Sequence, residues 1–237
     1  AIRRTASARA LDQRSPRVDP APPLNYCPVM GSAELDALRA KIHEIEGRPM
    51  VVRRRFPTGV PAFDALTDGL PKPGIVELAG PEGTGRCRAV LAVLAAATRD
   101  REAVAWVDPL QRFFPPSADD HGVQLERLLV VRPVEDGQSP WLWATEQLLR
   151  SGCFRWVVVD WPGSPNAPRN TLQRWARAAE TGDCTAIVLA TRATQGLPAD
   201  LRFAVSEGEL VLVRDRTGTT GRVAPLPPPP LKADPWG

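Results

Sequence analysis

The sequence predicts an α/β fold in which a mostly parallel sheet is flanked by helices. Three observations predict it. Short apolar segments recur along the middle of the 237-residue chain, without the strict polar alternation of a half-exposed strand. Segments with helical spacing separate most of them. A glycine-rich loop joins the first apolar segment to an alanine-rich one. Apolar strands that alternate with helices are typical of a parallel sheet covered on both faces.

The chain begins with an arginine- and proline-rich segment, residues 1–32, that predicts a disordered basic arm. Residues 33–46 predict an amphipathic helix. Its aliphatic stripe consists of Leu35, Leu38, Ile42 and Ile45. One short helix cannot bury such a stripe alone, so we expect this N-terminal helix arm to bind a partner. The arm, 33–56, ends in an extended linker with a basic run at Arg53, Arg54 and Arg55, which we also assign to partner binding.

The core is expected over residues 57–222. Its strand candidates are 74–79, 103–107, 128–132, 156–160 and 185–190. Helices are expected near 85–98, 139–151 and 170–181. Two further strands are expected near 202–206 and 209–214. Residues 223–237 predict a proline-rich tail.

Composition narrows the functional classes. The net charge of +3 permits contact with nucleic acid but does not argue for it. No apolar run approaches the ~20 residues of a membrane span, so we expect no membrane segment. The four cysteines form no close pair and there are only two histidines, so we expect no metal site and a cytoplasmic protein.

The motif that raises the functional question is GPEGTGRC, residues 80–87. Gly80, Gly83 and Gly85 have the spacing of a loop whose backbone N–H groups bind phosphate. That loop pattern requires Lys followed by Ser or Thr, whereas this chain has Arg86 and Cys87. Arginine is planar and bulky where lysine is compact, and a thiol is a poor ligand for Mg²⁺. The sequence therefore predicts a vestigial phosphate loop with no required cofactor, and weak binding of ATP or ADP is left open.

From about residue 34 to residue 221 the chain resembles the RecA recombinase family. Three segments carry the resemblance: FPTGVPAFDALTDGLPKPGIVELAGPEGTGR, AVAWVDPLQRFFPPSADDHGVQLERLLVVRP and SGCFRWVVVD. The resemblance implies a RecA-like P-loop core preceded by the N-terminal helix arm. It also implies that Asp160, at the end of a strand, is a vestigial Walker B carboxylate. The alternative is that Asp160 caps the next turn.

The positions on which catalysis depends in that family are replaced here. The resemblance places the family's phosphate-loop Lys and Thr at Arg86 and Cys87. It places the catalytic Glu at Leu110, the adenine-stacking Tyr at Ser117, and the γ-phosphate-sensing Gln near Thr191. Hydrolysis needs a group that orients water, and leucine cannot do this. The resemblance thus implies a degenerate ATPase site and a protein that is not an enzyme.

The two DNA-binding loops of the family are short in this chain. Four arginines remain as candidate DNA contacts, or alternatively form a solvated surface: Arg169, Arg174, Arg192 and Arg202.

Shortened, degenerate chains of this kind resemble the ImuA group, which acts in the damage-induced (SOS) mutagenesis response. This resemblance implies a non-catalytic accessory in translesion DNA synthesis, associated with the nucleoid. Its implied partners are an inactive Y-family polymerase-like protein and an error-prone replicative-type polymerase. Self-association through the N-terminal helix and weak binding of single-stranded DNA are also expected. Two alternatives stay open: a divergent ATP-dependent DNA-binding RecA paralogue, and an inhibitor of cell division similar to SulA.

Overall fold

The computed structural model describes residues 33, 34, 37, 41, 53–134, 140–163, 169–216 and 218–228. The basic arm and the end of the proline-rich tail lie outside the described residues, and so does the aliphatic stripe at Leu35, Leu38, Ile42 and Ile45. The helix expected over 33–46 is described at four exposed, helical positions: Ala33, Glu34, Ala37 and Lys41. Among the described helices, none combines the length and hydrophobicity that a membrane span requires.

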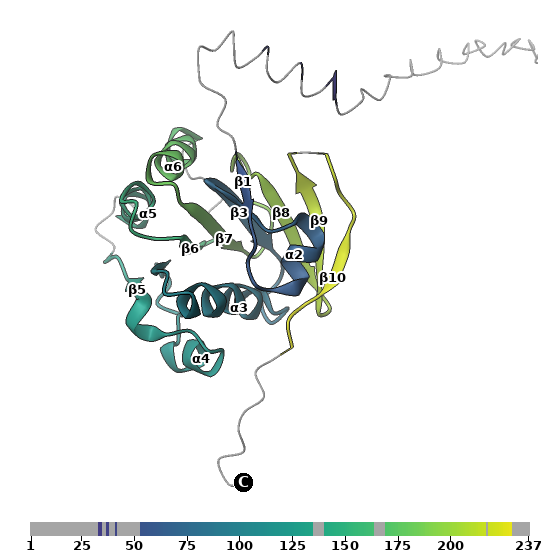
Figure 1. Ribbon diagram of the computed structural model, residues 1–237. Helices are drawn as coiled ribbons and strands as arrows, with labels where there is room; N and C mark the ends of the chain where they lie inside the picture. Colours follow the sequence, from purple (N-terminus) through teal and green to yellow (C-terminus); the bar gives the residue numbers. More distant parts are fainter. Residues whose placement is uncertain are drawn as a thin grey trace, which may run out of the picture.

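The core is built on an eight-stranded sheet with the order β10-β9-β8-β3-β7-β6-β4-β5 (Figure 1). Its strands are β3 (Gly74–Ala79), β4 (Val104–Val107), β5 (Leu128–Val131), β6 (Trp156–Asp160), β7 (Thr185–Ala190), β8 (Leu201–Ser206), β9 (Glu209–Asp215) and β10 (Val223–Pro225). The pairs from β5 through to β8 are parallel, and β8–β9 and β9–β10 are antiparallel. The predicted α/β fold with a mostly parallel sheet is therefore confirmed.

Helices cover both faces of the sheet, as the unalternating strands require (Figure 1). The helical elements are α2 (Pro61–Thr67), α3 (Arg86–Arg99), α4 (Pro115–Asp120), the short 3-10 turn η1 (Leu125–Arg127), α5 (Pro140–Arg150) and α6 (Arg169–Gly182). One apolar cluster joins α2 and α3 to one face of the sheet. A second cluster joins α5 and α6 to the other face. Every residue of β3, β6 and β7 is buried between these layers.

Three tryptophans form the centre of the cluster under α5 and α6. The rings of Trp141, Trp161 and Trp175 meet edge to face with centroids 5.1 to 6.2 Å apart. Trp141 and Trp161 are buried because their indoles complete the aromatic cluster. Trp143, on the outer side of α5, is exposed, at 65%.

Both ends of the core extend further than the sequence suggested. Residues of strand β1 (Arg54–Phe56) were expected to belong to the extended linker, but they pair antiparallel with β2 (Leu70–Lys72). Strand β10 was assigned to the tail, but it pairs with β9. Beyond it, the buried Leu226 donates its backbone N–H to the Gly208 carbonyl at 2.8 Å. These short segments have no periodicity of their own, so only their tertiary pairing reveals them.

Candidate functional site

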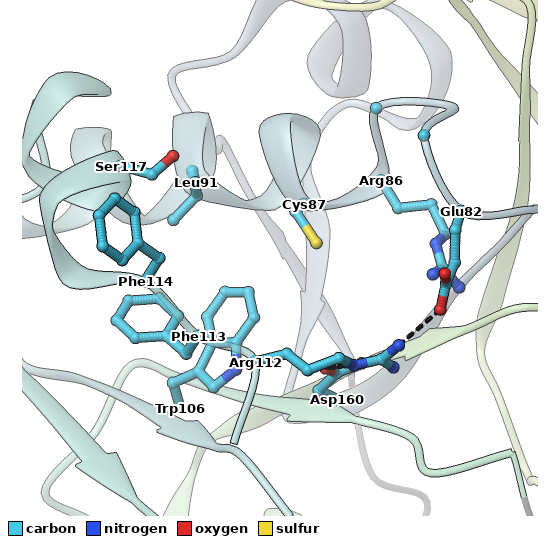
Figure 2. Close-up of a pocket in the computed structure, with 12 residues that line it drawn as sticks. Glu82, Arg86, Cys87, Leu91, Trp106, Arg112, Phe113, Phe114, Ser117 and Asp160 are labelled. Atoms are coloured by element: carbon cyan, nitrogen blue, oxygen red, sulfur yellow. Dashed lines mark hydrogen bonds and ion pairs between the residues drawn. The ribbon is translucent and has the colours of Figure 1, made fainter. Parts of the chain in front are cut away.

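A pocket of about 460 Å³ lies where the carboxyl ends of β3, β4 and β6 meet the start of α3 (Figure 2). Ligand sites of parallel α/β sheets occur at this end of the strands. One half of the pocket is charged and is formed by Glu82, Arg86, Arg112 and Asp160. The other half is apolar and is formed by Leu91, Trp106, Phe113 and Phe114. Gly83, Gly85, Cys87 and Ser117 complete the lining.

The backbone of the phosphate loop depends on its glycines. Gly85 has φ +98° and leads directly into α3, a conformation that favours glycine strongly. A Cβ atom at Gly80 would collide with the carbonyl oxygen of Val205 on the neighbouring strand β8. The N-cap residue of α3 is Gly85, which has no side chain to accept a hydrogen bond from the first N–H groups of the helix. The predicted loop residues Gly83, Gly85, Arg86 and Cys87 line the pocket together with Asp160.

Three of the four charged side chains of the pocket pair with one another. Arg112 Nη1 donates to Glu82 Oε1 at 2.5 Å, and Arg112 Nε lies 3.6 Å from Asp160 Oδ2. Arg86, which is only 7% exposed, faces the same pocket. Two arginines thus balance the two carboxylates, and the local charge sums to zero.

Burial governs the ionisation of two side chains in the pocket. The pKa of Asp160 is raised by burial, and the nearby charges of Arg112 and Arg86 reverse this only in part. The pKa of the Cys87 thiol is raised by burial and by the charge of Asp160, so the thiol is the favoured form. The side chain of Cys87, which reaches the surface, thus carries a thiol, a poor ligand for a hard cation.

A buried aspartate sets the position of Arg112. Asp108 follows β4, is fully buried, and accepts the backbone N–H groups of Arg112 at 2.8 Å and Phe113 at 3.0 Å. It also accepts Arg132 Nε at 3.0 Å. Gln111 adopts φ +54°, which turns the chain just before Arg112. These interactions fix the loop that carries Arg112 into the pocket.

Of the positions at which the RecA resemblance places catalytic or nucleotide-binding residues, some line the pocket and others lie outside it. Ser117 lines the pocket, whereas Leu110 is 37% exposed and is not part of the lining. Thr191 is exposed at the end of β7. A nucleoside triphosphate with Mg²⁺ needs a hydroxyl and a free carboxylate for the metal, together with a water-orienting group. Position 87 carries a thiol and both pocket carboxylates are paired, so the residues present do not fit that ligand.

The sequence interpretation missed Glu82, Arg112 and Asp108. Arg112 lies at none of the positions to which the resemblance assigns a role. A signal was available: Arg112 stands among the apolar residues Leu110, Phe113 and Phe114, and a glutamate lies between the glycines of the phosphate loop. Among the described residues, no group of three or more His, Cys, Asp or Glu is placed to hold a metal ion.

The arginines expected to contact partners or DNA are partly bound within the chain. Arg202 pairs with the buried Glu77 and donates to the Thr194 carbonyl, and Arg174 pairs with Glu146 on α5 at 3.0 Å. Arg192 is exposed after β7, and Arg169 begins α6. In the basic run, Arg53 pairs with Glu180 and Asp200, and Arg55 pairs with Asp215. Arg54 is exposed. The proposed contacts of these residues stay predictions, and Arg54, Arg174 and Arg192 are the exposed ones among those whose exposure is described.

Known proteins with similar sequences point to one family. The family model of the RecA N-terminal domain matches residues 45–184. Protein RecA from Prochlorococcus marinus strain MIT 9313 is 33% identical over 160 residues, which cover 65% of this chain and 41% of that protein. Protein RecA from Symbiobacterium thermophilum is 39% identical over 107 residues, which cover 44% of this chain and 30% of that protein. The chain spans less than half the length of these relatives.

Proposed function

The chain belongs to the family of the RecA N-terminal domain, and we propose that it is a non-catalytic accessory protein of damage-induced, error-prone translesion DNA synthesis. In this role, similar to that of the ImuA group, it binds an inactive Y-family polymerase-like protein and an error-prone replicative-type polymerase near the nucleoid. The observation that carries the proposal is the pairing of Arg112 with both carboxylates of the phosphate-loop pocket. A pocket whose charges are already satisfied is poorly suited to nucleotide chemistry.

The chemistry of the pocket supports the absence of catalysis. ATP hydrolysis requires Mg²⁺ held by oxygen ligands and a group that orients the attacking water. Glu82 and Asp160 both face Arg112, and Cys87 offers sulfur where a hydroxyl is needed. Leu110 stands at the position of the water-orienting residue and has no polar atom in its side chain. Each replacement removes a different part of the catalytic machinery.

An unpaired edge of the core supports a binding role. Strand β5 is at the end of the sheet order, so one side of its backbone has no neighbouring strand among the described residues. Leu129 on this strand is 44% exposed, and Val134 just beyond it is 81% exposed. An exposed apolar edge favours the addition of an extended segment from another chain. We propose that a helix-and-strand segment of the partner docks here, while this chain offers its own helix arm, residues 33–46, in return.

The proposal is tested by damage-induced mutagenesis in cells and by co-purification of the polymerase partners. Leu38→Asp with Ile42→Asp is expected to abolish both, because charges on the aliphatic stripe prevent it from being buried. Lys41→Gln, at an exposed position of the same helix, is the matched control and should behave as wild type. Arg86→Ala should also leave mutagenesis largely intact. Loss of mutagenesis in Arg86→Ala, with full activity of the double variant, would contradict the proposal.

A further inference from the structure

We propose that Arg112 is the resident counter-cation of the phosphate-loop pocket. Its guanidinium takes the place that a divalent cation would need between the loop and strand β6, and it holds the loop against that strand without any ligand. The inference rests on the proposed loss of nucleotide chemistry but not on the identity of the polymerase partners.

The geometry makes Arg112 a bridge between two separate elements. Glu82 lies in the loop between β3 and α3, whereas Asp160 is the last residue of β6. These two strands are not neighbours, because β7 lies between them in the sheet. Arg112 comes from a third element, the loop after β4, and reaches both carboxylates, at 2.5 Å and 3.6 Å (Figure 2). A single side chain therefore links three segments at the carboxyl ends of the strands.

The backbone at Arg112 is held by contacts within the chain. Its backbone N–H and that of Phe113 are both held by the buried Asp108. Arg132, which also pairs with Asp108, donates from Nη2 to the Phe113 carbonyl at 2.7 Å and secures the other side of the same turn. The backbone that carries Arg112 is thus rigidly supported, and the side chain, which is 45% exposed, is directed by its two carboxylate partners.

Arg112 balances the negative charge of the pocket carboxylates. With Arg112 the two carboxylates are balanced by two arginines. Without it, Glu82 and Asp160 face the pocket with only Arg86 to offset them, and the local charge becomes −1. Paired carboxylate oxygens without a cation are the ligands that Mg²⁺ and Mn²⁺ prefer. Removal of the guanidinium should therefore create a divalent-cation site that the wild-type chain does not have.

The test is a titration of nucleotide-free, full-length protein with Mn²⁺, followed by calorimetry and thermal unfolding. Arg112→Met is expected to gain one saturable Mn²⁺ site, about ten-fold or more tighter than any binding by wild type. Its unfolding temperature should rise with Mn²⁺, because a ligand that binds only the folded state stabilises it. Glu82→Gln added to Arg112→Met should remove the site. Arg150→Met is the matched control, since Arg150 also pairs with a glutamate, Glu146, but lies on α5.

A second variant keeps the proposal testable if Arg112→Met does not fold. Glu82 is 65% exposed, so Glu82→Gln should fold normally and only release the bridge. Backbone hydrogen exchange over residues 82–86 should then accelerate about five-fold or more, with no change in β6 or β7. Equal Mn²⁺ binding by wild type and Arg112→Met, or unchanged exchange in Glu82→Gln, would overturn the assignment. ATP turnover by wild type would instead contradict the proposed function, so the two failures are distinguishable.

Discussion

Replacement of Asp108 by alanine should cost a large share of the stability of the protein. The carboxylate is fully buried and accepts two backbone N–H groups and one guanidinium N–H. A buried N–H group left without an acceptor costs about 1–3 kcal/mol, which applies to Phe113. The N–H of Arg112 is only partly buried and the Arg132 side chain is 44% exposed, so water can replace part of the hydrogen bonding that each group loses with Asp108. Together these losses suggest about 3 kcal/mol of unfolding free energy.

The loss is measured by urea denaturation and thermal unfolding. About 3 kcal/mol corresponds to roughly 6–12 °C in the unfolding temperature of a domain of this size. Asp108→Asn keeps one oxygen acceptor and should lose about half as much. Asp119→Ala, at an exposed position of α4, is the control and should stay within about 0.5 kcal/mol of wild type. A change of less than about 1 kcal/mol in Asp108→Ala would refute the view that this carboxylate organises the loop carrying Arg112.

Three further predictions follow from the site. Purified protein should hydrolyse ATP at less than about one turnover per minute, with or without single-stranded DNA, and faster turnover that is lost in Asp160→Asn would show a working site. Binding to single-stranded DNA should be weak and should fall steeply as salt rises, because arginine–phosphate contacts release counterions; fluorescence anisotropy at low salt and at ~0.5 M salt measures this, and tight binding at the higher salt would contradict it. Burial raises the pKa of Asp160 in the folded state, so the folded protein binds this proton more tightly than the unfolded chain does. The contribution of Asp160 to the free energy of unfolding is therefore fully present at low pH. It is lost as the pH rises through the pKa of the folded state. Asp160→Asn should therefore equal or exceed wild type in stability near pH 7, and this relative advantage should shrink toward pH 4; a variant clearly less stable than wild type near pH 7 would contradict the sign.

The fold could be predicted from the sequence where apolar runs and helical spacing were long enough. Strands β3, β6 and β7 have the predicted bounds, because five or six consecutive buried residues leave little ambiguity. Strands β1 and β10 have three residues each and depend on a neighbouring strand for their hydrogen bonds. Their membership in the core is a tertiary property, so no local pattern predicts it.

The site was predicted less completely than the fold. The loop glycines, Arg86, Cys87 and Asp160 could be placed together because the carboxyl ends of parallel strands meet at one edge of the sheet. Arg112 could not be placed, because its direction is set by the Asp108 hydrogen bonds and by the backbone of Gln111. Charge pairing across three segments depends on side-chain geometry, which residue spacing alone does not determine.

The shape of the phosphate loop has a structural cause that does not involve nucleotide. Gly80 lies against the Val205 carbonyl, and a side chain at Gly85 would meet the buried Leu226 beyond β10. The helix that the loop starts, α3, buries nine of its fourteen residues, many of them in the apolar cluster on one face of the sheet. A change in the loop backbone would disturb these contacts, at a cost typical of core disruption. The chain can therefore lose the side chains that bind Mg²⁺ and phosphate while the loop around them keeps its form. A retained loop backbone is thus weak evidence for retained ATP chemistry, whereas the pairing of Glu82 and Asp160 with Arg112 bears on that chemistry directly.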